Sequence, residues 1–142
     1  MSQVNTMQPK IFPLDEMIVG GYDYGEKTTY TTHHLGVDYK AVFVPLMAPC
    51  DGEIVNVFTG TEGGLTIWFR PAGETTILRF LHLSEYRCRK GDLVTQGKVI
   101  AITGDSGKSE GAHLHHDIWK KSVTLRFSDT INPHTYYPKV GG

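Results

Sequence analysis

The sequence predicts a mainly β fold, in which a compact single domain is built from antiparallel β-sheets. Sixteen glycines and seven prolines separate short stretches rich in β-branched and aromatic residues, a pattern typical of strands joined by tight turns. No segment has a long apolar stripe with the 3.6-residue period of an amphipathic helix. A chain of 142 residues can bury the core of one domain without disulfides.

Each expected strand is bounded by residues that favour turns. In chain order the strands are EIVNVF (53–58), LTIWF (65–69), TTILRFLHL (75–83), KVIAIT (98–103) and the region of GAHLHHDIW (111–119). The chain is expected to reverse at Asp51-Gly52, Gly60 to Gly64, Pro71 to Gly73, Gly91-Asp92 and Gln96-Gly97. The final segment, NPHTYYPKVGG, is expected to pack loosely.

The last of these strands concentrates titratable groups. Side chains alternate between the two faces of a strand, so His113, His115 and Asp117 are expected on one face and His116 on the other. Two imidazoles and a carboxylate on one face can converge on a single centre. A solvated, histidine-rich strand explains the segment equally well, and the other histidines must distinguish the two interpretations.

The overall charge excludes some classes of partner. With 14 basic and 15 acidic residues the net charge is -1, which argues against binding to nucleic acid or to an anionic membrane surface. No apolar run approaches the roughly 18 residues needed to cross a bilayer, and no secretory signal is visible at the start. Cys50 and Cys88 are expected to be free thiols, with a single bridge between them as the alternative.

A further segment supplies groups for a metal site. HHLGVDY (33–39) places His34 and Asp38 four residues apart. An extended strand would separate them by about 13 Å, too far for one ion with bonds of about 2 Å, so the chain must bend, and Gly36 could permit the bend. One histidine of the 113/115 pair would complete two imidazoles and a carboxylate, a ligand set of catalytic zinc sites that leaves the fourth position open to water.

The histidines that remain on this interpretation are suited to moving protons. Among them, His113 and His82, the latter within RFLHLS (79–84), are expected near the metal, and imidazoles titrate near neutral pH. Neither His116 nor His134 is expected to contact the metal; each is expected to face solvent or to cap a turn.

Taken together, His34-Leu-Gly36-Val-Asp38, His82-Leu83-Ser84 and His113-Leu114-His115 resemble the motifs of the lysostaphin/LytM-type zinc endopeptidases, which cut peptidoglycan peptides. VPLMAPCDGEIVNV is similar to the Ala-Pro-x-x-Gly strand entry of that family. KGDLVTQGKVIAITGDSGKSEGAHLHHDI is similar to its glycine-rich approach to the His-x-His strand. The resemblance covers roughly residues 20–120.

The resemblance implies a zinc-containing groove that binds one Zn²⁺ per chain. The implied ligands are His34, Asp38 and His115. His82 and His113 would flank the water bound to the metal, one as the general base and the other stabilising the oxyanion, and the sequence does not assign the two roles.

The sequence and the resemblance also lead to expectations for residues that lie next to these motifs. The His-x-Gly-x-Asp spacing selects His34 as the ligand instead of the adjacent His33. Tyr30 is a candidate oxyanion donor. Asp117 is expected either to fix the tautomer of an imidazole or to face solvent. Family members often have an aromatic residue at the position of His116 and glutamate at that of Asp117.

The resemblance predicts a zinc-dependent endopeptidase that hydrolyses peptide cross-links or bridges of bacterial peptidoglycan. We expect a monomer whose single peptidase domain spans residues 1–142, with a catalytic core at about 20–120. The expected place of action is the cell wall, extracellular or periplasmic, and a phage-type lysin or a trimmed catalytic core would explain the missing signal. A non-catalytic, LytM-like module that regulates wall hydrolases is the alternative, which the complete set of site residues disfavours.

Overall fold

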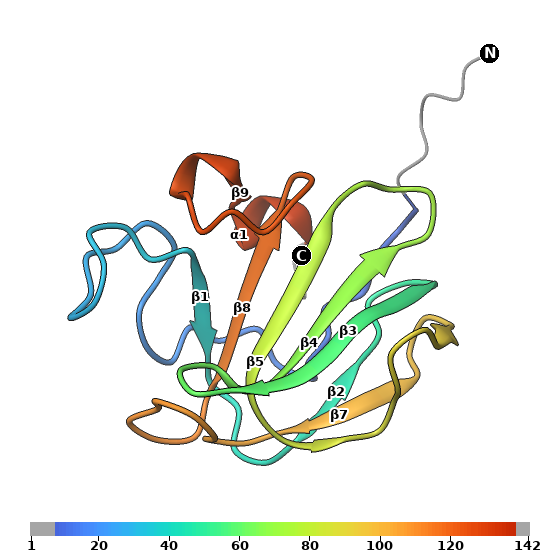
Figure 1. The fold of residues 1–142 in the computed structure, drawn as a ribbon, viewed down its shortest axis with the longest axis horizontal. Coiled ribbons are helices and arrows are strands. Elements are labelled where there is room, and N and C mark those ends of the chain that lie inside the picture. Colours follow the sequence, from blue (N-terminus) through green and yellow to red (C-terminus); the bar gives the residue numbers. More distant parts are fainter. Residues whose placement is uncertain (1–7, 139–142) are drawn as a thin grey trace.

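The computed structural model describes residues 8–138 (Figure 1). Its strands are β1 (Gly36–Tyr39), β2 (Pro45–Met47), β3 (Gly52–Gly60), β4 (Gly64–Pro71), β5 (Ile77–Tyr86), β6 (Leu93–Val94), β7 (Val99–Thr103), β8 (Leu114–Trp119) and β9 (Thr130–Ile131). Within the described residues, helix is limited to the 3-10 turn η1 (Phe127–Asp129) and the short helix α1 (Pro133–Tyr136). The prediction of a mainly β fold is confirmed, and every predicted strand is present.

The strands form one antiparallel sheet in two connected groups. The main path runs β1-β8-β5-β4-β3-β6, while β2 and β7 pair with each other beside it and β9 pairs with β8. Figure 1 shows β1, β8, β5, β4 and β3 side by side, with β2 and β7 below them. The long strand β5 joins the two groups, because its first part pairs with β8 and its last part pairs with β7.

Strand β5 changes partners at His82. Leu81 is the last residue of β5 paired with β8, and Leu83 pairs with β7. Between them His82 has a φ of 64°, a left-handed conformation that strains a residue with a side chain. The register with β4 shifts in the same region, and such bulges re-aim side chains. His82 therefore lies inside β5, which continues to Tyr86, whereas the strand predicted from the sequence ended at residue 83.

The core contains apolar side chains from most of the strands. Its fully buried members include Val37, Tyr39, Leu46, Ile54, Ile67, Phe69, Leu78, Phe80, Ile100, Leu114 and Ile118. Strand β8 is buried along its whole length, since it lies between β1 and β5 and contacts α1. Polar side chains on β8 must therefore find partners within the protein.

The C-terminal segment packs firmly, so the prediction of loose packing is wrong for the part that the structure describes. Tyr137 is 5% exposed, and its ring lies edge-on to that of Phe12 with 5.3 Å between centroids. Its hydroxyl lies 2.6 Å from Nε2 of His116 on β8. Residues 139–142, the end of the same predicted segment, lie outside the described residues.

Within residues 8–138, no helix has the length and apolar character needed to span a membrane. Cys50 and Cys88 are free thiols, as predicted, and the alternative of a bridge between them is wrong. Burial raises the pKa of each thiol to about 11.

Candidate active site

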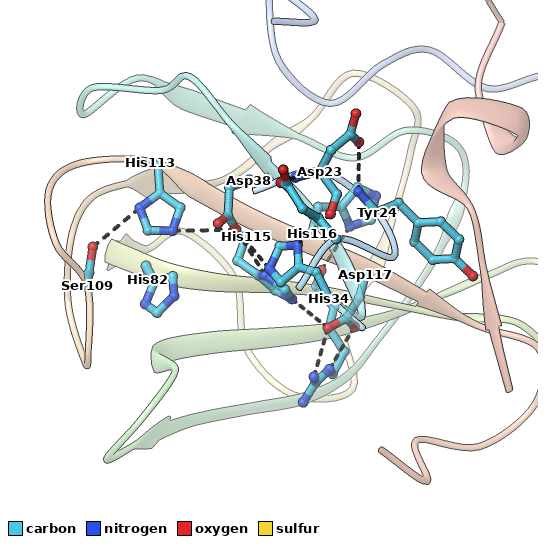
Figure 2. A network of polar contacts seen from close by, with 12 residues as sticks. Asp23, Tyr24, His34, Asp38, His82, Ser109, His113, His115, His116 and Asp117 are labelled. Carbon is cyan, nitrogen blue, oxygen red and sulfur yellow. Dashed lines mark hydrogen bonds and ion pairs between the residues drawn. The ribbon is translucent and has the colours of Figure 1, made fainter. Parts of the chain in front are cut away.

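The predicted ligands His34, Asp38 and His115 come together where β1 pairs with β8 (Figure 2). Asp38 lies opposite His115 in the antiparallel register, and the chain bends at Leu35, directly after His34. One ligand atom from each of the three residues lies within 4.8 Å of the other two. His115 Nδ1 and His34 Nε2 lie 3.1 and 3.5 Å from Asp38 Oδ1. The buried cluster can hold a metal ion.

Hydrogen bonds at the far side of each imidazole decide which nitrogen faces the cluster. His34 Nδ1 donates to the backbone carbonyl of Asp23 at 3.2 Å, which leaves Nε2 directed toward Asp38. His115 Nε2 donates to Asp117 Oδ2 at 2.8 Å, which leaves Nδ1 directed toward Asp38. Each of the two predicted ligand histidines therefore directs one nitrogen toward the cluster while a fixed partner holds the other, the arrangement typical of metal-binding histidines.

The charges of the cluster are coupled. Burial, together with the neighbouring charge of His115, lowers the pKa of His34. Burial by itself would raise the pKa of Asp38, but hydrogen bonding and attraction to His115 hold it below its ordinary value. For His115, the hydrogen bonds to Asp117 and Asp38 outweigh the effect of burial and raise its pKa to about 9. The pair of carboxylates thus favours a cation at this point.

Gly36 brings β1 and β8 close together. A Cβ at this position would lie 2.2 Å from the carbonyl oxygen of His116 and 2.7 Å from Cβ of Asp117, so no side chain fits while the strands keep this separation. The sequence assigned Gly36 a different task, the bend between His34 and Asp38. The bend exists one residue earlier, and close approach is the physical reason for glycine.

His82 and His113 lie beside the ligands with their rings tilted toward each other and 4.8 Å between centroids (Figure 2). His82 Nδ1 donates to the carbonyl of Ser106 at 2.8 Å, and His113 Nδ1 donates to that of Gly111 at 2.9 Å. In both residues Nε2 is therefore the basic nitrogen. His113 Nε2 lies 3.6 Å from Asp38 Oδ1, and burial lowers the pKa of His82.

An apolar groove opens beside this cluster. It is a cavity of about 320 Å³ whose walls include His34, His115, Phe58, Glu62, Leu81 and Leu125. A larger cavity, of about 440 Å³, lies at the other end of β3 and β4 beside Gly52 and Pro71. Of these two cavities, only the smaller one is lined by histidines. The smaller cavity is therefore the candidate binding groove.

The sequence of this region decides the family. Residues 32–127, which contain all three histidine motifs, match Peptidase family M23. The chain belongs to this family of metallopeptidases. Membership agrees with the resemblance seen in the sequence, and the M23 match includes every groove-wall residue except Thr31 as well as the three histidine motifs.

Individual relatives fall in the same group. The chain is 33% identical over 99 residues to the glycyl-glycine endopeptidase ALE-1 of Staphylococcus capitis, a match covering 67% of this chain and 27% of ALE-1. It is 30% identical over 86 residues to the peptidoglycan DD-endopeptidase ShyA of Vibrio cholerae, covering 60% of this chain and 20% of ShyA. The chain therefore spans a minor part of the length of these curated relatives.

A solved structure extends the similarity to three dimensions. The catalytic domain of the antimicrobial peptidase lysostaphin from Staphylococcus simulans superposes with a TM-score of 0.74 at 28% sequence identity. The superposition covers 82% of this chain and 89% of that domain. The described fold is thus that of an M23 catalytic domain.

The remaining histidines lie away from the cluster of His34, Asp38 and His115. His33 is exposed and stacks on Phe127 with 5.0 Å between ring centroids. His134 pairs with Asp23 at 2.7 Å on the surface. His116 lies on the opposite face of β8, as the strand pattern predicts, but it is fully buried, so the expectation that it faces solvent is wrong. Burial lowers its pKa to about 4.

Asp117 and Tyr30, the two other residues expected to assist the site, differ in whether they contact the predicted ligands. Asp117 is fully buried and accepts from His115, so the solvent-facing alternative is wrong. Tyr30 is 73% exposed on the loop beside Thr31, a residue of the groove wall. Its role as an oxyanion donor stays a prediction.

Arg79 is the site residue that sequence reasoning missed. It lines the groove and makes two 2.8 Å hydrogen bonds to the carboxylate of Asp117. A signal was present in the sequence, because a lone arginine inside the apolar run TTILRFLHL requires a partner when that run is buried.

Proposed function

We propose that the chain is a zinc-dependent endopeptidase that hydrolyses peptide cross-links or bridges of bacterial peptidoglycan. The observation that supports this most strongly is the convergence of three separate motifs on one point. His34, Asp38 and His115 form the cluster, and His82 and His113 lie beside it. M23 membership and relatives named for endopeptidase activity support the same proposal.

Zinc suits this set of donor atoms. Two imidazole nitrogens and one carboxylate oxygen form a ligand set of catalytic zinc sites, in which the fourth position stays open. In a tetrahedral site with zinc bonds of about 2.0–2.1 Å, neighbouring ligand atoms lie about 3.3 Å apart. The distances from Asp38 Oδ1 to His115 Nδ1 and His34 Nε2, 3.1 and 3.5 Å, lie on either side of this value.

When bound, zinc acts as a Lewis acid toward water and the scissile carbonyl. The protons are handled by His82 and His113, whose Nδ1 protons are held by the backbone carbonyls of Ser106 and Gly111. One Nε2 accepts the proton of the attacking water and returns it to the leaving amine. The other imidazole takes a proton at Nε2 from solvent before the attack and, as an imidazolium, donates a hydrogen bond to the developing oxyanion.

Glu62 and Arg79 are charged members of the groove wall, but the rest of the wall is mainly apolar or glycine and suits a largely uncharged peptide backbone. Phe58 and Leu125 present exposed apolar surface at the groove walls, and Gly60 and Gly63 add wall without side chains. Such walls exclude water from the bond that is cut. We propose the cell wall, extracellular or periplasmic, as the place of action, and one peptidase domain over residues 1–142 with its core at about 20–120.

The test is digestion of purified peptidoglycan, with the released peptides identified by mass spectrometry. We expect cleavage that stops with a chelator and returns with added zinc. His82→Ala and His113→Ala are expected to retain zinc but to lose about 10²- to 10⁴-fold in rate. A chain that binds zinc and cleaves none of the walls tested would favour the regulatory module instead.

A further inference from the structure

We propose that Arg79 is a positioning residue for the metal site: acting through Asp117, it holds His115 in the orientation and tautomer that present Nδ1 to zinc. This inference rests on the proposed zinc site. In this ion pair Asp117 contacts the proposed ligand His115 directly, and Arg79 reaches His115 only through Asp117.

Asp117 is saturated with hydrogen-bond donors. Arg79 donates from Nε to Oδ1 and from Nη2 to Oδ2, each at 2.8 Å. His115 Nε2 donates to Oδ2 at 2.8 Å, and Trp119 Nε1 donates to Oδ1 at 2.6 Å. Each carboxylate oxygen therefore accepts two hydrogen bonds, and rotation of the carboxylate would break several of them at once.

The strand register places the pair where it can act. Arg79 of β5 lies directly opposite Asp117 of β8, and Asp117 lies two residues from His115 on the same face of β8. The arginine side chain also lies over the Trp119 ring, with 5.6 Å from the guanidinium carbon to the ring centroid. Arg79, Asp117 and Trp119 thus form one packed unit behind the ligand histidine.

Burial makes the arginine necessary for the carboxylate. The side chain of Asp117 is 0% exposed and that of Arg79 is 12% exposed. An unpaired charge at such a depth is strongly unfavourable. Loss of Arg79 would remove two of the four hydrogen bonds that Asp117 accepts, and the unpaired carboxylate would then be more stable if it moved toward water in the groove. The planar guanidinium matches the carboxylate with two parallel bonds, which lysine cannot reproduce.

The consequence for the metal follows from the single hydrogen bond between Asp117 and His115. Because Asp117 accepts from Nε2, Nδ1 is the nitrogen of His115 that faces the metal site, 3.1 Å from Asp38 Oδ1. Zinc binding releases the Nδ1 proton, and the lone pair then freed on Nδ1 is the one directed at the metal. Partners of this kind behind a ligand histidine typically contribute 10- to 100-fold to metal affinity. We assign that contribution to the Arg79–Asp117 pair in this chain.

The experiment measures zinc affinity of the full chain by competition with a chromophoric chelator. Arg79→Met and Asp117→Asn are expected to bind zinc about 10- to 100-fold more weakly than the parent chain. The zinc affinity of Arg79→Lys is expected to lie between that of the parent chain and that of Arg79→Met. Arg87→Met is the matched control, because Arg87 pairs with Glu85 at the exposed surface, and its zinc affinity should equal that of the parent.

A second readout separates positioning from general stability. Nitrogen-15 NMR of the histidines should show His115 protonated only at Nε2 in the zinc-loaded parent, and a mixture of tautomers or a lost signal in Arg79→Met. Zinc affinity within threefold of the parent and an unchanged His115 spectrum in Arg79→Met would overturn the inference. If Arg79→Met does not fold, the same result in Arg79→Lys would overturn it.

Wall digestion distinguishes this inference from the proposed function. A parent chain that binds zinc and cleaves no peptidoglycan refutes the proposed endopeptidase, while the affinity differences among the variants still support the role of Arg79. A parent chain that binds no zinc overturns both.

Discussion

Replacing Gly36 by alanine is predicted to weaken the fold and the metal site together. The new Cβ would lie 2.2 Å from the carbonyl oxygen of His116 and 2.8 Å from Cα of Asp117. Because both atoms belong to the backbone of β8, β1 must move away by about 1 Å, and overpacking of this kind typically costs about 1–3 kcal/mol. Asp38 and His115 lie opposite each other in the same pair of strands, so the separation of the two ligands changes as well.

The expected size can be stated for both measurements. A domain of 142 residues has an unfolding entropy of about 0.3 kcal/mol/K, so this cost lowers Tm by about 3–10 °C. Metal sites tolerate only about 0.2 Å of change in ligand distance, and zinc affinity of Gly36→Ala should fall by at least about tenfold. Thermal unfolding of the metal-free chain and chelator competition measure the two effects separately.

Gly60→Ala is the matched control for this substitution. A Cβ at Gly60 would meet Phe58 at 3.6 Å, an ordinary contact, so only the general effect of alanine on chain entropy remains, typically below about 1 kcal/mol. If Gly36→Ala has the Tm and the zinc affinity of Gly60→Ala, the argument that close approach of β1 and β8 builds the site is refuted.

Three further predictions concern the thiols, the groove and the covered face of β8. At pH 8, Cys50 and Cys88 should react with a disulfide reagent roughly a hundredfold more slowly than ordinary cysteine, because burial raises each pKa to about 11. Their rates should rise about tenfold per pH unit below that pKa, and a rate at pH 8 equal to that of free cysteine would contradict the burial. Leu125→Gly should keep or raise Tm, because Leu125 has a φ of 66°, a conformation that glycine adopts without strain. The same variant should raise KM for wall fragments about tenfold through lost apolar contact. An unchanged KM would show that Leu125 does not contact the substrate. Tyr137→Phe leaves buried His116 without its hydroxyl partner and should cost about 1–3 kcal/mol in urea unfolding, whereas unchanged stability would show that the contact contributes nothing.

The sequence predicted the fold class and the meeting of the histidine motifs because both depend on local signals. Turn residues and period-two patterns mark the strands. The alternation along GAHLHHDIW correctly separated His115 and Asp117 from His116, since the faces of a strand follow directly from its backbone. The assignment of His34, Asp38 and His115 as ligands stays a proposal, but the structure does bring the three together.

The features that sequence reasoning missed depend on contacts between distant segments. Burial of His116 results from coverage by Tyr137, which no pattern within β8 reveals. The requirement for glycine at residue 36 arises from the approach of β8, and the partner of Arg79 is fixed only by the register of β5 against β8. Each is a property of packing between strands, which a local pattern does not encode.

The central claim is that His34, Asp38 and His115 hold a zinc ion that the chain uses to cut peptidoglycan peptides. The most direct measurement is the zinc content of the purified chain and of His115→Ala, with each preparation also assayed for release of peptides from purified walls. The account predicts about one zinc per chain and peptide release for the parent, and loss of both in the variant. Peptide release by His115→Ala at the parental rate, or a parent chain free of zinc that still cleaves, would contradict it.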